Sequence, residues 1–395
     1  MNILITGLTL HHNKGGPALA LSLINKLNTQ FDNPVYYMSV PNFQDNLQKE
    51  RVWANFYGVK EVTGAIGVKH ILPPFSWKRS LRMQKKQYVE LMSRMDLIVD
   101  LTALSFMDLP HLTFKQNLAR NLSIFTSRII ARRCHKPLIR WTQSYGPFAY
   151  RITKQIVQND LKGQKHLFVR GEQSFKYMKE LFDETRLHIF PDIAITLPSN
   201  TSTAITLKTT EPYVTVSPSS VLYSLNQEKH LQDTIDLIVQ LQNRYKVVLV
   251  PHNLMTINPT PYNCDLEVCK LINSRLQNKA EILSEDLDVF SLKGIIANAY
   301  MHIGARYHSI IASLSSAVPT VSYAWHSKYQ DIMQLYGMEK YVFEQSQPAT
   351  ALLQLVQELE ENHMKIQNTL KKNQLNLEEQ IHQNLVLFME NLHAL

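Results

Sequence analysis

The chain has 395 residues, of which 45% are hydrophobic, and its 41 lysine and arginine side chains outnumber 33 acidic ones to give a net charge of +8. This apolar content excludes a disordered chain, and the length predicts two or three domains that each bury a core. The positive excess suggests an anionic partner. The three cysteines, Cys134, Cys264 and Cys269, are too few and too irregularly spaced for a disulfide framework or a zinc motif, so we expect a reducing compartment.

The N-terminal segment has neither the pattern of a secretory signal nor that of a membrane span. The apolar run at residues 2–7 lacks a preceding basic region and a small-residue cleavage site, so we interpret it as a β-strand and expect a cytoplasmic protein. The longest uncharged stretch, residues 309–325, contains a proline and five serines and is shorter than the ~20 apolar residues of a membrane span. We therefore expect no segment that crosses a bilayer.

The first half of the chain alternates short apolar runs with amphipathic stretches. Strands are expected at residues 2–7, 35–40 and 96–101, and the glycine-containing turn at 13–17 leads into a helix over 18–27. Further on we expect a helix over 112–133, strands at 137–143 and 167–170, and a helix over 173–182. This alternation predicts a parallel sheet with helices on both faces.

A second alternating region follows a Ser/Thr-rich stretch, which we interpret as a linker over residues 198–212. Strands are then expected at 213–217, 247–250, 281–283, 301–304 and 320–323, and helices at 228–245, 265–276, 289–298 and 307–315. The pattern predicts an α/β protein with two doubly wound, Rossmann-like domains, residues 1–197 and 213–345, that face a cleft. Residues 346–395 have helical spacing of apolar residues and are expected to pack across the domain junction.

The segment from residue 301 to 328 contains the most informative candidate binding and acid/base residues. An apolar run ends at Gly304, and Arg306 and His308 then open a helix, whose unpaired N–H groups and dipole favour an anion. Arg306 offers a planar fork to oxyanions, and His308 can carry a proton near neutral pH. These residues predict an anion site with an acid/base group. The structural alternative is that Arg306 pairs with an acid at the sheet end and that His308 is a hydrogen-bonded core histidine.

Other polar residues also follow predicted strands. His252 comes directly after the strand at 247–250, which makes it a second acid/base candidate. Lys328 follows the strand at 320–323 and could reach a phosphate, although a solvated loop lysine explains it as well. Asp192 is the leading carboxylate, and its structural alternative is a helix cap or a loop anchor.

The turn Asn13-Lys14-Gly15-Gly16-Pro17 lies between a predicted strand and a predicted helix. It lacks both the GxGxxG and the GxxxxGK[ST] pattern, so a dinucleotide site and a P-loop are excluded. Its place after a strand makes Asn13, Gly15 and Gly16 candidate ligand contacts. A simple turn with Pro17 at the first helical position accounts for the segment equally well.

Five segments in the same order resemble the polysaccharide pyruvyl transferase family. The longest is Gly304-Ala305-Arg306-Tyr307-His308, with Asp286 before it and Ala312, Pro319, Tyr323 and Lys328 after it. The others are Asn13-Lys14-Gly15-Gly16, Gln143-Ser144-Tyr145-Gly146-Pro147, Arg170-Gly171-Glu172-Gln173-Ser174 and Pro191-Asp192-Ile193-Ala194. The resemblance spans about residues 1–340, and five segments in order are far more specific than one.

The resemblance implies a two-domain, glycosyltransferase-B-like fold. It also implies transfer of the enolpyruvyl group of phosphoenolpyruvate to sugar hydroxyls of an exopolysaccharide, another cell-surface glycan or a lipid-linked precursor, forming a pyruvate ketal and releasing phosphate. Arg170, Arg306, Tyr307, His308 and Lys328 are then expected to bind phosphoenolpyruvate, which serves as the donor substrate without a cofactor or metal. His308 is assigned as general acid/base or phosphate ligand, and His252 as a second catalytic candidate.

The acceptor side is expected to include Asn13, Gly15, Gly16 and Gln143. The chain departs from the family pattern in two places. Residues 100–105 lack the glycines that many members have after the corresponding strand, so the acceptor or its binding mode is expected to differ. Gly171 stands where an Asp usually follows the arginine, which leaves open the partner that orients Arg170. Two other functions remain open: a nucleotide-sugar glycosyltransferase, with Glu267 or Glu285 as the ribose ligand, and a non-catalytic anion-binding protein.

The positive charge gathers in two clusters, Lys78, Arg79, Arg82, Lys85 and Lys86, and Arg128, Arg132, Arg133, Lys136 and Arg140. Few aromatic residues accompany them, and no nucleic-acid-binding module is recognised, so we expect no nucleic acid partner. A solvated helix face is the ordinary explanation. The more specific hypothesis is that the first cluster contacts anionic lipid at the inner face of the membrane, or a lipid-diphosphate acceptor.

Overall fold

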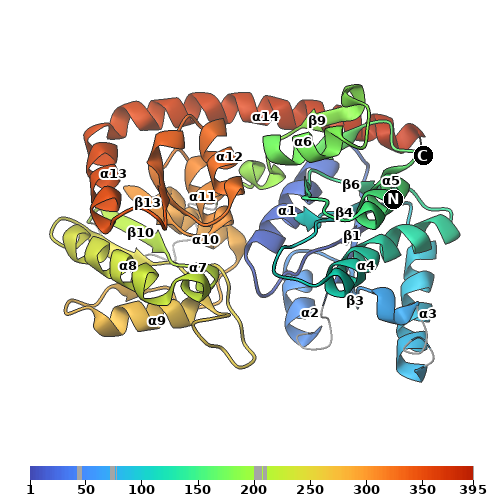
Figure 1. Ribbon diagram of the computed structural model, residues 1–395, viewed down its shortest axis with the longest axis horizontal. Helices are drawn as coiled ribbons and strands as arrows, with labels where there is room; N and C mark the ends of the chain where they lie inside the picture. Colours follow the sequence, from blue (N-terminus) through green and yellow to red (C-terminus); the bar gives the residue numbers. More distant parts are fainter. Residues whose placement is uncertain (42–46, 72–75, 77, 200–206, 208–210, 395) are drawn as a thin grey trace. The chain divides into compact units, whose positions relative to one another are not determined.

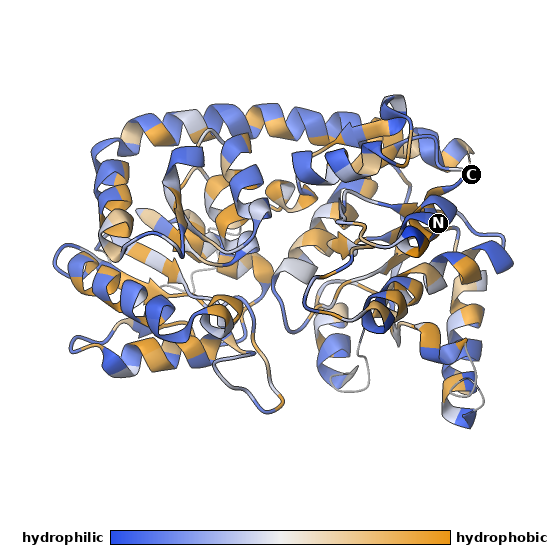
Figure 2. Ribbon diagram, in the orientation of Figure 1, coloured by the Kyte–Doolittle hydropathy of each residue, from blue (hydrophilic) through white to orange (hydrophobic). Residues whose placement is uncertain are grey.

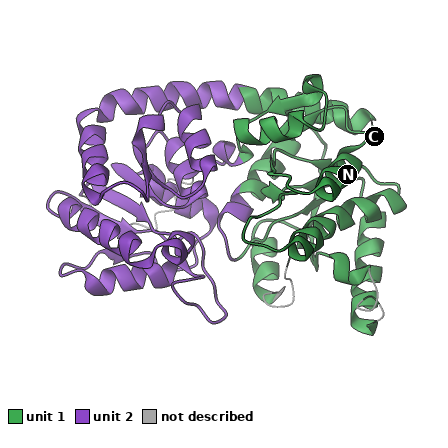
Figure 3. Cartoon of the chain, in the orientation of Figure 1, with its two compact units in different colours: residues 1–11, 19–193, 380–395 green, residues 12–18, 194–379 purple. Residues whose placement is uncertain are grey.

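The computed structural model describes residues 1–41, 47–71, 76, 78–199, 207 and 211–394 (Figure 1). The chain divides into two compact units (Figure 3). Unit 1 comprises Met1–His11, Leu19–Ile193 and Gln380–Leu395, and unit 2 comprises His12–Ala18 and Ala194–Glu379. The predicted linker over 198–212 falls mostly outside the described residues.

Unit 1 is built on a parallel five-stranded sheet in the order β3-β2-β1-β4-β6. The strands are β1 (Asn2–Thr6), β2 (Val35–Val40), β3 (Glu61–Gly64), β4 (Leu97–Asp100) and β6 (Leu138–Arg140). From β1 the chain adds β2 and β3 on one side of β1, and it then adds β4 and β6 on the other side. Ligands of open α/β sheets bind where the strand order reverses in this way, which in unit 1 lies between β1 and β4.

The helices of unit 1 bury apolar residues in the cores of the unit. They are α1 (Gly15–Leu27), α2 (Leu47–Phe56), α3 (Arg79–Ser93), α4 (Phe114–Arg133), α5 (Arg151–Leu161) and α6 (Glu172–Lys179). Residues from α3, α4, β4 and β6, including Tyr88, Met92, Ile98, Ile130 and Leu138, form one core. Two short parallel pairs complete the unit: β5 (Leu104–Ser105) with β7 (Ser144–Tyr145), and β8 (Leu167–Val169) with β9 (Leu187–Ile189).

Unit 2 has a parallel six-stranded sheet in the order β12-β11-β10-β13-β14-β15. Its strands are β10 (Tyr213–Ser217), β11 (Lys246–Leu249), β12 (Glu281–Ile282), β13 (Met301–Gly304), β14 (Thr320–Ala324) and β15 (Val342–Glu344). Numbered within the unit, this is the 3-2-1-4-5-6 order of dinucleotide-binding domains, with the reversal between β10 and β13. Both sheets together confirm the prediction of two doubly wound α/β domains.

The helices of unit 2 are α7 (Ser220–Leu225), α8 (Gln227–Leu241), α9 (Asp265–Arg275), α10 (Val289–Ala297), α11 (Tyr307–Leu314), α12 (Ser327–Leu335), α13 (Ala349–Glu361) and α14 (His363–Ala394). Figure 2 shows apolar residues concentrated on the strands, while many helices carry apolar and polar residues side by side. Helix α14 belongs to unit 2 up to Glu379 and to unit 1 from Gln380. The expected packing of residues 346–395 across the domain junction, like the cleft, stays a prediction.

Two residues of the second basic cluster are buried, whereas Arg132 and Arg133 are exposed, as a solvated helix face predicts. Arg128 and Arg140 are only 4% and 1% exposed. Arg140 donates to Asp160 at 2.5 and 2.7 Å and to Asp100 at 2.7 Å, and Arg128 Nε lies 3.9 Å from Asp160. The interpretation as a solvated face was wrong for Arg128 and Arg140, because two carboxylates distant in sequence neutralise them inside the unit, as buried charges require.

Among the described residues, none of the helices combines the length and the hydropathy that crossing a bilayer requires.

Candidate functional site

Arg306 lies where the strand order of unit 2 reverses. The loop after β10 contains Ser220, the first residue of α7, and the loop after β13 contains Arg306, the residue that precedes α11. Arg306 Nη2 donates to Ser220 Oγ at 2.8 Å, so one hydrogen bond joins the two loops. This is the position at which α/β sheets bind their ligands, and it places Arg306 at the centre of the candidate site.

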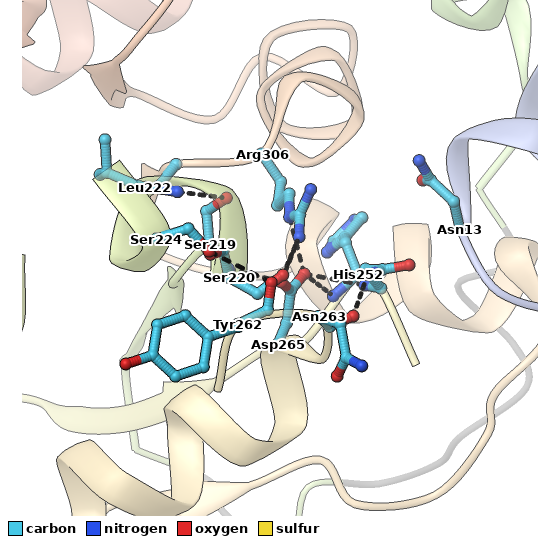
Figure 4. Close-up of polar contacts among 12 residues, drawn as sticks. Asn13, Ser219, Ser220, Leu222, Ser224, His252, Tyr262, Asn263, Asp265 and Arg306 are labelled. Carbon is cyan, nitrogen blue, oxygen red and sulfur yellow. Dashed lines mark hydrogen bonds and ion pairs between the residues drawn. The ribbon is translucent and has the colours of Figure 1, made fainter. Parts of the chain in front are cut away.

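A single carboxylate, that of Asp265, fixes the loops around Arg306 (Figure 4). Asp265 is fully buried at the start of α9, and its Oδ2 accepts from Arg306 Nε at 2.8 Å while its Oδ1 accepts from Arg306 Nη2. The same carboxylate accepts from the backbone N–H groups of Ser220 at 2.9 Å, His252 at 3.2 Å and Asn253 at 2.8 Å. It therefore ties the loops after β10, β11 and β13 together.

Pairing with Asp265 does not use the whole guanidinium of Arg306. Burial lowers the pKa of Arg306, but the Asp265 carboxylate outweighs burial and the pKa is raised overall. The alternative that Arg306 pairs with an acid is therefore correct. Within the described part of the chain, Nη1 donates no hydrogen bond, and the side chain is 12% exposed. Arg306 thus keeps a fixed, charged donor for an anion.

His252 lies beside this network. It is 4% exposed, its N–H donates to Asp265, and its ring Nδ1 is 3.5 Å from the carbonyl oxygen of Val250. Burial lowers the pKa of His252 to about 4, although Asp265 acts in the opposite direction. The imidazole is consequently neutral at pH 7, which suits a proton acceptor better than a proton donor.

The turn at Asn13–Gly15 belongs to unit 2 rather than to the N-terminal domain in which it was expected. Lys14 N donates to His252 O at 3.0 Å, Leu254 N donates to His12 O at 2.8 Å, and Asn13 forms an antiparallel bridge with Asn253. These bonds add the turn to the loop after β11. The predicted domain boundaries of 1–197 therefore differ from the observed unit 1, which excludes residues 12–18.

His308 is packed against the same turn. A Cβ atom built on Gly15 would lie 2.1 Å from His308 Nδ1, so the imidazole occupies the space that a side chain at position 15 would fill. Lys14, His252 and His308 line one small cavity of about 20 Å³, together with Lys293 of α10 and apolar residues of α10 and α11. The structure thus brings two predicted histidines and the glycine turn into one place.

Lys328 reaches this region through aromatic side chains. Its Nζ lies 5.2 Å from the ring centre of Tyr307, 5.0 Å from that of Trp325 and 5.6 Å from that of Tyr329, distances that allow cation–π attraction. The ring of Tyr307 in turn meets that of His308 edge to face at 5.3 Å. The cation is therefore held next to the helix start that carries His308.

The remaining predicted residues lie in unit 1. Arg170 follows β8 and donates to Asp192 at 2.5 Å, to Ser144 Oγ at 3.1 Å and to the carbonyl oxygen of Ala103 at 2.9 Å. Asp192 is thus a partner that orients Arg170, in the absence of an Asp at position 171. Gln143 is fully buried and its amide donates to Asp100, so its role as an acceptor contact stays a prediction.

Sequence reasoning missed Asp265, Ser220 and the role of Lys14. Asp265 was recognised only as the start of a helix, because an acid in a first turn is ordinary there. The proposed ribose ligands have other surroundings: Glu267 pairs with Lys270 at 2.8 Å, and Glu285 is exposed.

Comparison with solved structures shows that the fold is glycosyltransferase-B-like. The Anabaena protein HepE in complex with UDP has a TM-score of 0.60 at 13% identity over 100% of both chains. A putative UDP-N-acetylglucosamine 2-epimerase from Listeria monocytogenes has a TM-score of 0.59 at 10% identity, covering 94% of this chain and 90% of that one. The kitacinnamycin glycotransferase has a TM-score of 0.55 at 12% identity over 99% of both chains.

The family follows from the sequence. A model of the polysaccharide pyruvyl transferase family matches residues 15–327, and this chain belongs to that family. The match includes the turn at Gly15, the segment around Arg170 and the Arg306–His308 motif. A search of the curated proteins gives no match.

Proposed function

We propose that this protein transfers the enolpyruvyl group of phosphoenolpyruvate to two hydroxyls of a glycan, forming a pyruvate ketal and releasing phosphate. The observation that carries the proposal is Arg306, held by the buried Asp265 at the start of α11 with Nη1 still available. A fixed guanidinium beside a helix N-terminus suits a small ligand with carboxylate and phosphate groups. Membership of the pyruvyl transferase family supports phosphoenolpyruvate as the donor.

The donor site in unit 2 comprises Arg306, the backbone of Tyr307 and His308, and the ammonium of Lys328. Arg306 and the N–H groups at the start of α11 bind oxyanions, and Lys328 adds a positive charge near the same helix end. Arg170 of unit 1 stays a predicted donor ligand, with its guanidinium oriented by Asp192. We propose that the donor requires no cofactor and no metal.

The chemistry needs one proton for the methylene carbon and removes two hydroxyl protons. A general acid protonates C3 with the electrons of the C2–C3 double bond, and the first acceptor oxygen adds to the cationic C2 and loses its proton. Phosphate then leaves with the electrons of its C2–O bond, and the second hydroxyl closes the ketal. One hydroxyl proton restores the acid and the other leaves with hydrogen phosphate, so atoms and charge balance.

We assign the two histidines to opposite proton transfers. His308 opens α11 next to the proposed donor ligands, so it is placed to deliver the proton to C3. His252 is neutral at pH 7 because burial lowers its pKa to about 4, so it is suited to receive a hydroxyl proton. Positive charge from Arg306 and Lys328 stabilises the departing phosphate.

The acceptor is proposed to be a cell-surface glycan or its lipid-linked precursor, with Gln143 on the acceptor side. A lipid-linked acceptor would be reached at an anionic membrane surface. In support, Arg79, Arg82 and Lys86 of α3 are all exposed and recur at helical spacing on one face. Polybasic segments of this kind bind anionic lipid with about 1 kcal/mol per charge.

The test is a reaction of the purified protein with phosphoenolpyruvate and a glycan panel, read as phosphate release and as acceptor mass. The proposal expects both signals together, and a parallel reaction with nucleotide sugars should give no product. Phosphate release without a pyruvyl mass gain would contradict ketal transfer. Glycosyl transfer from a nucleotide sugar would favour the glycosyltransferase alternative. Anion binding without any turnover would favour the non-catalytic alternative.

A further inference from the structure

The turn at residues 13–15 is bound to the loop that carries His252. Two backbone hydrogen bonds, Lys14 N to His252 O at 3.0 Å and Leu254 N to His12 O at 2.8 Å, flank the Asn13–Asn253 bridge. Asn13 also accepts from Gly15 N at 3.0 Å, which closes the turn on itself. The turn is therefore fixed to unit 2 at the carboxyl ends of its strands, where the proposed donor site lies.

Lys14 anchors the turn from its side chain as well. Its Nζ donates to Asp286 Oδ1 at 2.5 Å, and the lysine is 1% exposed whereas the Asp286 side chain is 38% exposed. A buried lysine of this kind is costly unless an acid compensates it, so the pair fixes both residues. Asp286 is the more exposed partner of the pair, and Lys14 lines the cavity together with His252 and His308.

Gly15 sets how closely the turn approaches His308. With a Cβ at 2.1 Å from Nδ1 and ordinary contact starting at 3.4 Å, any side chain here would displace the imidazole by about 1.3 Å. The need for glycine at this position is steric, since its backbone dihedral angles are those of a helix start. The turn thus forms one wall against which the imidazole rests.

We propose that the Asn13–Gly15 turn is a wall of the phosphoenolpyruvate site, and that Lys14 is a positioning residue that holds this wall against His308. This inference rests on the proposed function, and it replaces the assignment of Asn13, Gly15 and Gly16 to the acceptor. The ligand class is a small enol phosphate, whose methylene carbon must meet a correctly oriented acid. Lys14 acts through Asp286 and the loop of His252 rather than on the substrate.

The experiment compares Gly15→Ala and Lys14→Met with a matched control, Lys246→Met. Lys246 also forms a 2.5 Å ion pair, with Glu281. It is the first residue of β11, however, so it lies at the opposite end of this strand from His252. Phosphoenolpyruvate affinity is measured by calorimetry, and KM is measured separately for donor and acceptor. Thermal melting of each variant reports folding.

The expected result for Gly15→Ala is a loss of about 100-fold in kcat/KM for phosphoenolpyruvate, because a shift of about 1 Å in a catalytic group costs this much. Lys14→Met should also lower kcat/KM for phosphoenolpyruvate, and Lys14→Arg should recover part of that loss. The KM for the acceptor should stay near the wild-type value, and so should the kinetics of Lys246→Met. A raised acceptor KM with unchanged phosphoenolpyruvate affinity would overturn the inference. If the wild type fails to bind phosphoenolpyruvate, the proposed function itself is wrong.

Discussion

Replacing Asp265 by asparagine probes what fixes Arg306. The side chain keeps its shape, but one oxygen becomes an NH2 group among donors. If that group replaces Oδ1, it opposes Ser220 N and Arg306 Nη2, and if it replaces Oδ2, it opposes three N–H groups. Either orientation loses at least two hydrogen bonds and leaves the buried guanidinium without its counter-charge.

Breaking a buried ion pair from one side costs about 3–5 kcal/mol. A body the size of unit 2 loses roughly 2–4 °C in melting temperature per kcal/mol, so Asp265→Asn should lower the transition of this unit by about 10 °C. Phosphoenolpyruvate binding should weaken as well, because Arg306 is no longer oriented.

The assay is thermal unfolding followed by circular dichroism, with and without phosphoenolpyruvate. Glu267→Gln is the matched control, since it makes the same chemical change on the same helix in a pair with Lys270 that is partly exposed. Partly exposed pairs contribute about 0–1 kcal/mol, so this control should melt within about 2 °C of wild type. An Asp265→Asn protein that melts as the control does would refute the role given to the carboxylate.

Three further predictions concern single side chains. Arg306→Lys keeps the charge but not the fork, and calorimetry should show phosphoenolpyruvate affinity reduced by about tenfold or more, whereas unchanged affinity would place the donor elsewhere. The pKa of His252 is lowered in the folded state to about 4, so its contribution to stability is complete above pH 6.5 and is lost as pH falls toward 4; NMR titration of its ring protons near pH 6.5 would contradict this. Arg82→Gln should reduce binding to anionic vesicles about fivefold in sedimentation, against no change for Lys371→Gln on α14, and equal loss in both would argue against α3 as the lipid contact.

The sheet of unit 2 was largely predictable because its strands are short, apolar and bounded by turns. The expected strand at 301–304 coincides with β13, and the expected helix at 307–315 with α11 to within one residue. In unit 1 the expected strand at 167–170 does form, but it pairs with β9 in a separate two-stranded sheet. Apolar content specifies a buried strand without specifying which neighbour it meets.

The site was predictable only where its residues are adjacent in sequence. Arg306 and His308 share one helix start and could be recognised together. Asp265 could not, because it meets Arg306 across 41 residues of chain and looks like any acid at a helix start. The placement of Lys14 depends on a bridge between Asn13 and Asn253, and no local sequence pattern predicts such a pairing.

The inclusion of residues 12–18 in unit 2 also affects how that unit can form. During synthesis the turn leaves the ribosome first, yet the backbone groups of His252 and Leu254 that bind it follow only after more than half of the chain has been made. The proposed donor site therefore closes late, by a contact between distant parts of the chain, which is a slow kind of folding event. A fragment that starts at residue 194 would contain all six strands of this sheet but would lack one wall of the proposed site.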